Sequence, residues 1–154
     1  MDQNLVKKLV NEAISENDSL FLIELSFLVA NRIKVVVDGD QGISIKECMR
    51  ISRHVEHNLD REEEDFGLEV TSPDISHPLT VRRQYLKNIN RILKVKTEEE
   101  EELEGTLVSA NEKGISLTWK TREPKPIGKG KVTVEKNAVI AFKSIKEAKV
   151  KITF

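Results

Sequence analysis

The sequence has a single cysteine, Cys48, so it can form no internal disulfide and no zinc site built from several cysteines. Aromatic residues make up only 5% of the chain, so any core must be mainly aliphatic. The longest apolar runs, near Leu20–Ile23 and Phe27–Ala30, are far shorter than the ~18 apolar residues of a membrane-spanning helix. The start, Met1–Asn4, has neither the basic residues nor the apolar core of a secretory signal. We therefore expect a cytoplasmic protein with no membrane contact.

Residues suited to catalysis or metal binding are few and form no recognisable set. His54 and His57 are three residues apart on an expected helix and could share a face, but they lack further ligands, which favours two surface histidines. Cys48 falls on the apolar side of the same helix, which is typical of a small core residue. The stretch Gly128–Lys131 lacks the spacing and the Ser or Thr of a phosphate-binding loop. We expect no catalytic residue, no metal site and no cofactor.

The net charge of −1 hides a strong difference between the two halves of the chain. Residues 1–81 have 8 Lys and Arg against 16 Asp and Glu, a net charge of −8. Residues 82–154 have 17 against 10, a net charge of +7. Such a separation concerns partners rather than the fold, since a basic half attracts phosphate and an acidic half attracts basic proteins or the other half. The alternative is a chance difference between two solvated surfaces.

Residues 1–81 predict a first domain with the element order α-β-β-α-β. Apolar residues recur at helical spacing over Asp2–Glu16, and the apolar, β-branched runs Leu20–Ala30 and Ile33–Val37 predict a hairpin. Ser44 and Glu47 form a capping box at the start of a second helix, because each side chain can bond the backbone amide of the other residue. A further strand follows that helix. We expect both helices to pack on one face of a three-stranded sheet.

The segment Leu68–Leu79 begins as a strand and ends as an irregular loop. Its apolar residues first alternate with polar ones, which is the period of a strand. Its two prolines then fix two φ angles and remove two backbone donors, and its short polar side chains can bond nearby backbone groups. We expect a stiff loop that sets the angle between two domains. Its candidate functional residues are Ser72, Pro73, Asp74, His77, Pro78 and Leu79.

Residues 82–154 predict a second domain that begins with a short helical connector and continues as a small, closed or nearly closed β-barrel. A hairpin connection is expected at Asn111–Gly114, with the glycine available for positive φ. Ser144–Glu147 fits a single helical turn before the last strand. The expected strands are Arg91–Thr97, Leu103–Ala110, Ile115–Lys120, Lys131–Val134, Ala138–Phe142 and Ala148–Phe154.

Two groups of basic residues in this second half are candidates for contact with RNA. One group lies in an expected extended loop between two strands, where prolines and glycines separate the cations, and the alternative is an exposed, solvated loop. The other group follows the central loop. Contacts with phosphate would make the affinity fall steeply with salt. The candidate residues are Arg82, Arg83, Lys87, Arg91, Lys120, Arg122, Lys125, Lys129 and Lys131.

Three segments together resemble the bacterial ribosome maturation factor RimP family. The segment Leu68–Leu79 is similar to the family's stretch in which Ser-Ser-Pro-Gly-Leu-Asp-Arg-Pro-Leu follows Leu-Glu-Val. The strand end Val35–Asp38, followed by Gly42–Ile45 and a helix, is similar to the family's strand, turn and second helix. The closing stretch Ile145–Val150 is similar to the family's last turn and strand. The resemblance covers nearly all of the chain.

The chain departs from the family pattern at three positions of the loop. Asp74 stands where the family has glycine, Ser76 where it has aspartate and His77 where it has arginine. Histidine is mostly neutral at pH 7, so a phosphate contact made by the family's arginine would be weaker here. Aspartate at a glycine position raises the question of whether the backbone has positive φ.

The resemblance implies an α+β fold of two domains, in which an α-β-β-α-β domain precedes an SH3-like or Sm-like barrel. It also implies a non-catalytic factor, monomeric and cytoplasmic, that binds the immature small (30S) ribosomal subunit, its 16S rRNA and a basic small-subunit protein. The run Glu98–Glu102 is then either a solvated, self-repelling hairpin tip or a contact for that protein. Trp119 is either a core residue or a platform for a base.

Two rivals belong to other classes of protein. A general Sm-like RNA-binding module would act on free RNA and would self-associate into rings, although its acidic half would oppose wrapping of RNA. An enzyme with an unrecognised site is disfavoured by the three histidines, the one cysteine and the lack of paired motifs.

Overall fold

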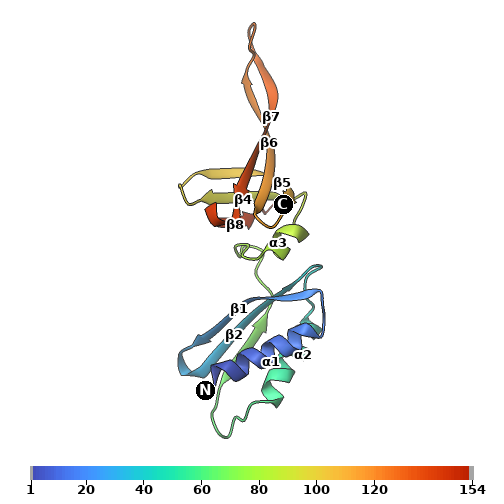
Figure 1. Cartoon of the computed structure of the whole chain (residues 1–154), viewed down its shortest axis with the longest axis vertical. Coiled ribbons are helices and arrows are strands. Elements are labelled where there is room, and N and C mark those ends of the chain that lie inside the picture. The colour runs from blue at the N-terminus through green and yellow to red at the C-terminus, as the bar shows by residue number, and fades with distance from the viewer. Residues whose placement is uncertain (1, 153–154) are drawn as a thin grey trace. The chain divides into compact units, whose positions relative to one another are not determined.

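The computed structural model describes residues 2–152, and its chain forms two compact units that separate between Asp74 and Ile75. Each unit has its own sheet and its own apolar core (Figure 1). The prediction of an α+β fold is confirmed. No helix in the described part of the chain has the length and the apolar content needed to cross a membrane.

The first unit consists of two helices and a three-stranded sheet in the expected α-β-β-α-β order. Strands β1 and β2 are antiparallel, and β3 lies parallel to β2, so the sheet order is β1-β2-β3. The parallel pair needs a long connection, which α2 supplies. The elements are α1 (Gln3–Ser15), β1 (Leu20–Leu28), β2 (Arg32–Gly39), α2 (Ile45–His57) and β3 (Gly67–Thr71).

The core of the first unit is aliphatic, as the low aromatic content predicts. One apolar cluster joins both helices to the sheet, and several of its residues have no exposed surface. These fully buried residues include Val6 and Val10 of α1, Val37 of β2, and Ile51 and Val55 of α2. Both helices therefore bury their apolar faces against the sheet, because apolar residues recur every three or four positions along each helix and so lie on one face.

Side chains cap both helices of the first unit. The Leu5 amide donates to Asp2 Oδ1 at 3.1 Å, and the Glu47 amide donates to Ser44 Oγ at 3.2 Å. The expected return bond of the capping box is not formed, because the Glu47 carboxylate instead accepts from the side chains of Arg50 and Asn17. The hydrogen bond from Arg50 contributes most to lowering the pKa of Glu47, and the bond from Asn17 contributes next. Glu47 thus ties α2 to the end of α1.

The second unit is a five-stranded antiparallel sheet preceded by the short helix α3. Its order is β7-β6-β5-β4-β8, so β7 and β8 are the edges and the barrel-like sheet is not closed. The elements are α3 (Arg82–Lys87), β4 (Ile92–Thr97), β5 (Glu102–Ala110), β6 (Gly114–Pro124), β7 (Lys131–Ala141), the 3₁₀ turn η2 (Phe142–Ser144) and β8 (Ile145–Val150). Leu93, Leu107 and Leu117 are fully buried at the centre of its core.

Two sequence-based predictions for the second unit are wrong. The expected strands at residues 131–134 and 138–142 are one continuous strand, β7, because Glu135, Lys136 and Asn137 pair with residues of β6. The expected helical turn at Ser144–Glu147 is instead the 3₁₀ turn η2 followed directly by β8. The last expected strand runs to Phe154, and its final two residues lie outside the described part of the chain.

Gly114 is required at the start of β6 for a reason other than the expected positive φ. Its φ is not positive, but a Cβ atom at this position would overlap the carbonyl oxygen of Ile140 and would lie 2.8 Å from Ala141 Cα. Backbone atoms of β7 cannot move aside without breaking the pairing that starts at Gly114 and Ala141. Close approach of two backbones therefore excludes any side chain here.

Gly114→Ala should lower the free energy of unfolding of the second unit by about 1–3 kcal/mol, because the added methyl group overpacks against backbone. Urea unfolding followed by Trp119 fluorescence measures this, since Trp119 is the one tryptophan and lies in this unit. Gly67→Ala in the first unit is the control, with its unfolding followed by circular dichroism, because a Cβ atom there would meet only Arg32 Cγ at 3.6 Å. Equal, small effects of both changes would contradict the role assigned to Gly114.

Candidate nucleic-acid interface

The strands β6 and β7 extend beyond the rest of their sheet as a two-stranded arm. Pairing of β5 with β6 ends where Thr106 lies opposite Thr118, whereas β6 and β7 continue to pair as far as Pro124 and Lys131. We call residues 119–136 the arm; it projects from the five-stranded sheet in Figure 1. The expected extended basic loop is therefore wrong for most of its length, since only residues 125–130 lie between the strands.

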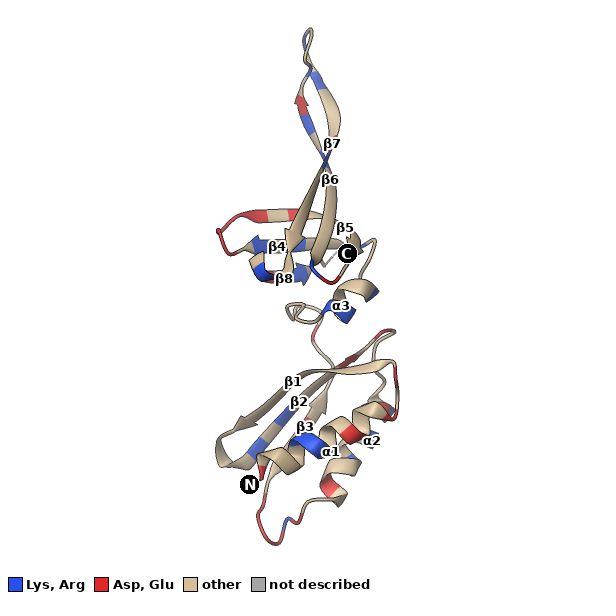
Figure 2. Ribbon diagram, viewed as in Figure 1, with Lys and Arg blue, Asp and Glu red and all other residues tan. Residues whose placement is uncertain are grey.

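Three cations of the arm lie on one face. In an antiparallel pair, residues directly opposite each other share a face, and residues two apart along a strand share it as well. Lys120 lies opposite Glu135, Arg122 opposite Thr133, and Lys131 opposite Pro124, so Lys120, Arg122 and Lys131 share one face with a single carboxylate, that of Glu135. All three side chains are exposed. Figure 2 shows basic residues along both strands of the arm. We call this surface the cationic face.

The opposite face of the arm is not cationic. Its one lysine, Lys136, forms an ion pair of 2.9 Å with Glu123. Val132 and Val134 lie on this face, and so does Trp119 at its base. Trp119 is partly buried and packs against the core of the second unit, in agreement with its interpretation as a core residue. The register of one hairpin thus places most of its basic side chains on one face and its valines on the other.

The tip of the arm adds two more of the candidate cations. Lys125 and Lys129 are exposed within residues 125–130. Gly128 and Gly130 have φ angles of +89° and +96°, and the Lys125 amide donates to the Gly130 carbonyl at 3.2 Å. The glycines permit this tight reversal because the left-handed region is accessible to them without strain. The tip therefore continues the positive charge of the cationic face.

The second basic group is organised by the short helix α3. The side chain of Gln84 accepts from the amides of Thr80 at 2.8 Å and Val81 at 3.3 Å, and it is buried. Arg82 and Arg91 are exposed, whereas Arg83 and Lys87 are partly exposed and have interactions with other groups. The predicted connector helix is confirmed. Its basic side chains remain candidates for phosphate contact.

Tyr85 anchors α3 to the second unit. Its ring is buried, its centroid is 5.2 Å from that of Phe142, and its hydroxyl donates to the Leu79 carbonyl at 3.5 Å. Burial raises the pKa of Tyr85 to about 12, because the phenolate would lose its hydration. The position of the basic connector is thus tied to the core.

The loop residues singled out in the sequence are divided between the two units. Ser72–Asp74 follow β3, and the Asp74 backbone does not have positive φ. His77 Nδ1 lies 2.9 Å from the Pro78 carbonyl oxygen. The Leu79 amide donates to the Ala148 carbonyl of β8 at 2.7 Å, and its side chain packs on the core of the second unit. The end of the loop therefore belongs to the second unit.

The glutamate run Glu98–Glu102 is not simply a self-repelling tip. Glu100 pairs with Lys146 at 2.7 Å and with Lys96 at 3.0 Å. The hydrogen bonds from Lys146 and then Lys96 lower the pKa of Glu100. Sequence alone could not show this, because Lys146 is distant in the chain and reaches Glu100 only after β8 has paired with β4.

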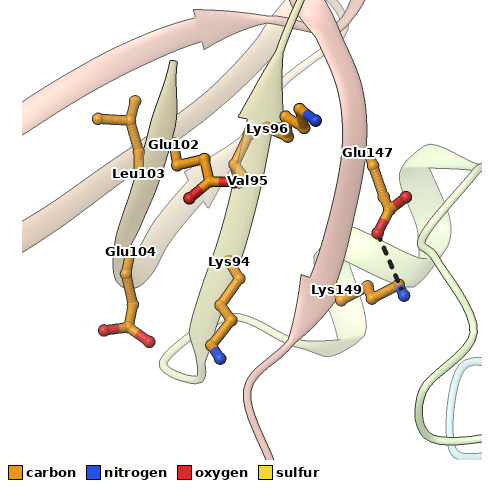
Figure 3. A pocket seen from close by; sticks show the side chains of 8 residues that line it. All are labelled: Lys94, Val95, Lys96, Glu102, Leu103, Glu104, Glu147 and Lys149. Atoms are coloured by element: carbon orange, nitrogen blue, oxygen red, sulfur yellow. Dashed lines mark ion pairs between the residues drawn. The ribbon is translucent and has the colours of Figure 1, made fainter. Parts of the chain in front are cut away.

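The outer face of β5, β4 and β8 carries charges of both signs (Figure 3). Lys94 pairs in register with Glu104, and Lys96 with Glu102 and Glu147. Lys149 forms an ion pair of 3.1 Å with Glu147. Opposite charges on neighbouring strands cancel each other's field at the distance of a polyanion. This face is therefore a poorer candidate for RNA than the cationic face of the arm.

The histidine and cysteine side chains form no reactive centre. His54 Nε2 lies 3.2 Å from Glu12 Oε2, and His57 is exposed. Within residues 2–152 no group of three or more His, Cys, Asp or Glu side chains could hold a metal ion. Cys48 is partly buried, and burial raises the pKa of its thiol, which disfavours the nucleophilic thiolate.

Comparison with known proteins agrees with this structure. A model of the RimP N-terminal domain family matches residues 9–76. A ribosome maturation factor RimP of Christiangramia forsetii is 58% identical over 149 residues, which cover 97% of each chain. The RimP of Flavobacterium psychrophilum is 46% identical over 97% of this chain and 96% of its own. The RimP of Porphyromonas gingivalis is 34% identical over 96% and 97%.

These similarities extend over both units, so they define a class of two-unit α+β proteins rather than a single shared domain. The chain belongs to the ribosome maturation factor RimP family. The resemblance expected from the loop, the β2 strand end and the closing strand is confirmed, and a role in ribosome maturation follows from it.

Titration of Tyr85 tests the packing that holds the basic connector. Phenolate absorbance should appear with a midpoint of about 12 in the folded protein and of about 10 in urea. The raised pKa contributes stability that is fully present below pH ~10 and is lost as the pH rises towards 12. Tyr85 is the one tyrosine, so Tyr85→Phe supplies the baseline. A midpoint near 10, with circular dichroism still native, would contradict its burial.

Proposed function

We propose that this protein binds the immature small (30S) ribosomal subunit in the cytoplasm and assists its maturation without catalysing a covalent reaction. Membership of the RimP family supports a role in ribosome maturation. The single structural observation that carries the proposal is the arm, in which Lys120, Arg122 and Lys131 share one exposed face and Lys125 and Lys129 are exposed at the tip.

In this proposal, the second unit supplies attachment to 16S rRNA. The cations of the arm, and those of the connector from Arg82 to Arg91, replace counterions on the phosphate backbone, so the affinity depends strongly on salt. Such contacts position a protein without reading sequence. Specificity then comes from the shape of the immature particle.

The first unit has a different role in the proposal. Its net charge of −8 repels RNA, and its acidic residues suit a basic small-subunit protein. We propose that the unit ending at Asp74 and the unit beginning at Ile75 are the two functional parts, one for a protein surface and one for rRNA. Maturation is assisted because the factor binds one conformation of the particle more tightly than the others and so raises its population.

Co-sedimentation of the purified protein with small subunits, large subunits and complete ribosomes tests the proposal. We expect selective binding to free small subunits, strongest for immature ones, at both low and moderate salt. Equal binding to all particles, or binding to naked RNA alone, would overturn it and would favour a general Sm-like RNA-binding module. Analytical ultracentrifugation of the free protein separates the two further, since that module predicts rings and our proposal predicts a monomer.

Replacement of Lys125, Lys129 and Lys131 together by Ala should weaken binding to small subunits and reduce the slope of log affinity against log salt by about 2, since each lost phosphate contact removes ~0.7–0.9. Replacement of Lys94, Lys113 and Lys143 is the matched control, because these lysines are exposed in the same unit but lie off the arm. If both triple variants change the slope equally, net charge rather than the arm governs binding.

A further inference from the structure

The tip of the arm has a large apolar side chain, Ile127, and contacts between the neighbouring cations and RNA phosphates do not account for it. Ile127 is 89% exposed, more than any other large hydrophobic residue that the structure describes. Isolated exposed aliphatic residues are common on protein surfaces, so exposure alone indicates nothing. The setting of Ile127 is what distinguishes it.

Ile127 lies exposed in the turn at the tip of the arm and is flanked by cations. Pro126 precedes it, and Gly128 follows it at a φ of +89°. Lys125 and Lys129 lie two residues away on either side, and both are exposed. An apolar group placed between two positive charges is suited to a partner that offers apolar surface between two negative charges. Stacked bases between two phosphate strands have that arrangement.

The arm is built for a duplex rather than for a single strand. Single-stranded nucleic acid is held mainly by aromatic side chains on which bases stack. The arm has one aromatic residue, Trp119, which lies at its base, on the face opposite to the cationic face, and is partly buried. Its exposed side chains include four lysines, one arginine and Ile127, which suit a phosphate backbone and a groove, and they also include Glu135.

The geometry of A-form RNA selects the groove. Its major groove is deep and narrow, whereas its minor groove is wide and shallow, with phosphates along both rims. A two-stranded ribbon can lie in such a groove, and minor-groove proteins often insert an aliphatic residue or proline between base pairs, where the stack is weakened. A bulge in an RNA helix lowers the cost of that insertion.

We propose that the arm lies in the minor groove of an irregular rRNA helix and inserts Ile127 as a wedge at a bulge, with Lys125 and Lys129 on the flanking phosphates. This deepens the proposed function and rests on it for the identity of the RNA. The arm would hold open a helix junction that must later close. Release of the wedge would then let the bases stack.

The test uses the full-length protein and a short RNA hairpin that has one bulged nucleotide and 2-aminopurine beside the bulge. Unstacking of 2-aminopurine raises its fluorescence, and we expect the protein to cause this rise. Ile127→Ala should abolish the rise and lower the affinity about tenfold, because the buried aliphatic surface is lost, while the salt slope is unchanged. Val29→Ala is the matched control, since Val29 is 84% exposed in the other unit.

Three outcomes would overturn the wedge: no fluorescence rise with the unaltered protein, the same rise with Ile127→Ala, or binding to single-stranded RNA but not to the hairpin. Loss of small-subunit binding by Ile127→Ala without any RNA binding would indicate a protein partner for the tip instead. Co-sedimentation separates the two proposals. Small-subunit binding without a fluorescence rise would contradict only the insertion of Ile127. A fluorescence rise without small-subunit binding would contradict the proposed function.

Discussion

Backbone pairing between β6 and β7 runs without a bulge from Gly114 and Ala141 to Pro124 and Lys131, and the cationic face of the second unit depends on this register. A bulge inserts one residue and reverses the facing of every side chain beyond it. Lys131 would then leave the cationic face and join the valines. The close approach at Gly114 matters for the same reason, because it fixes the register at the end of the hairpin nearest the core.

Features that depend on residues close together in the sequence, such as helix caps and helical spacing, could be predicted from the sequence alone. Ser44 caps its helix where expected, the apolar spacing of α1 predicts its buried residues, and the Leu68–Leu79 pattern indicates the family. β7 was predicted as two strands rather than one because Glu135, Lys136 and Asn137 are typical of a turn until β6 supplies their partners. Likewise, the cationic face was not visible in the sequence, since its cations are brought together by a pairing register rather than by spacing.

Charge is organised at two length scales in this protein. Over whole units, acidic and basic residues are separated, which gives −8 and +7. Within the second unit, the face of β5, β4 and β8 mixes lysine with glutamate in register, and Glu100 is held between Lys96 and Lys146. The excess of positive charge is thereby left to the arm and the connector. A field confined to part of a surface orients an approaching polyanion better than one spread evenly over it.

The arm also separates what stabilises the protein from what it recognises. The cationic face and tip contribute no residue to either apolar core, whose members lie in the sheets, helices and connecting segments. Substitutions there cost little folding stability, so the fold places little constraint on the sequence at these positions. The length and the charge of this ribbon can therefore change without a change in the scaffold that carries it.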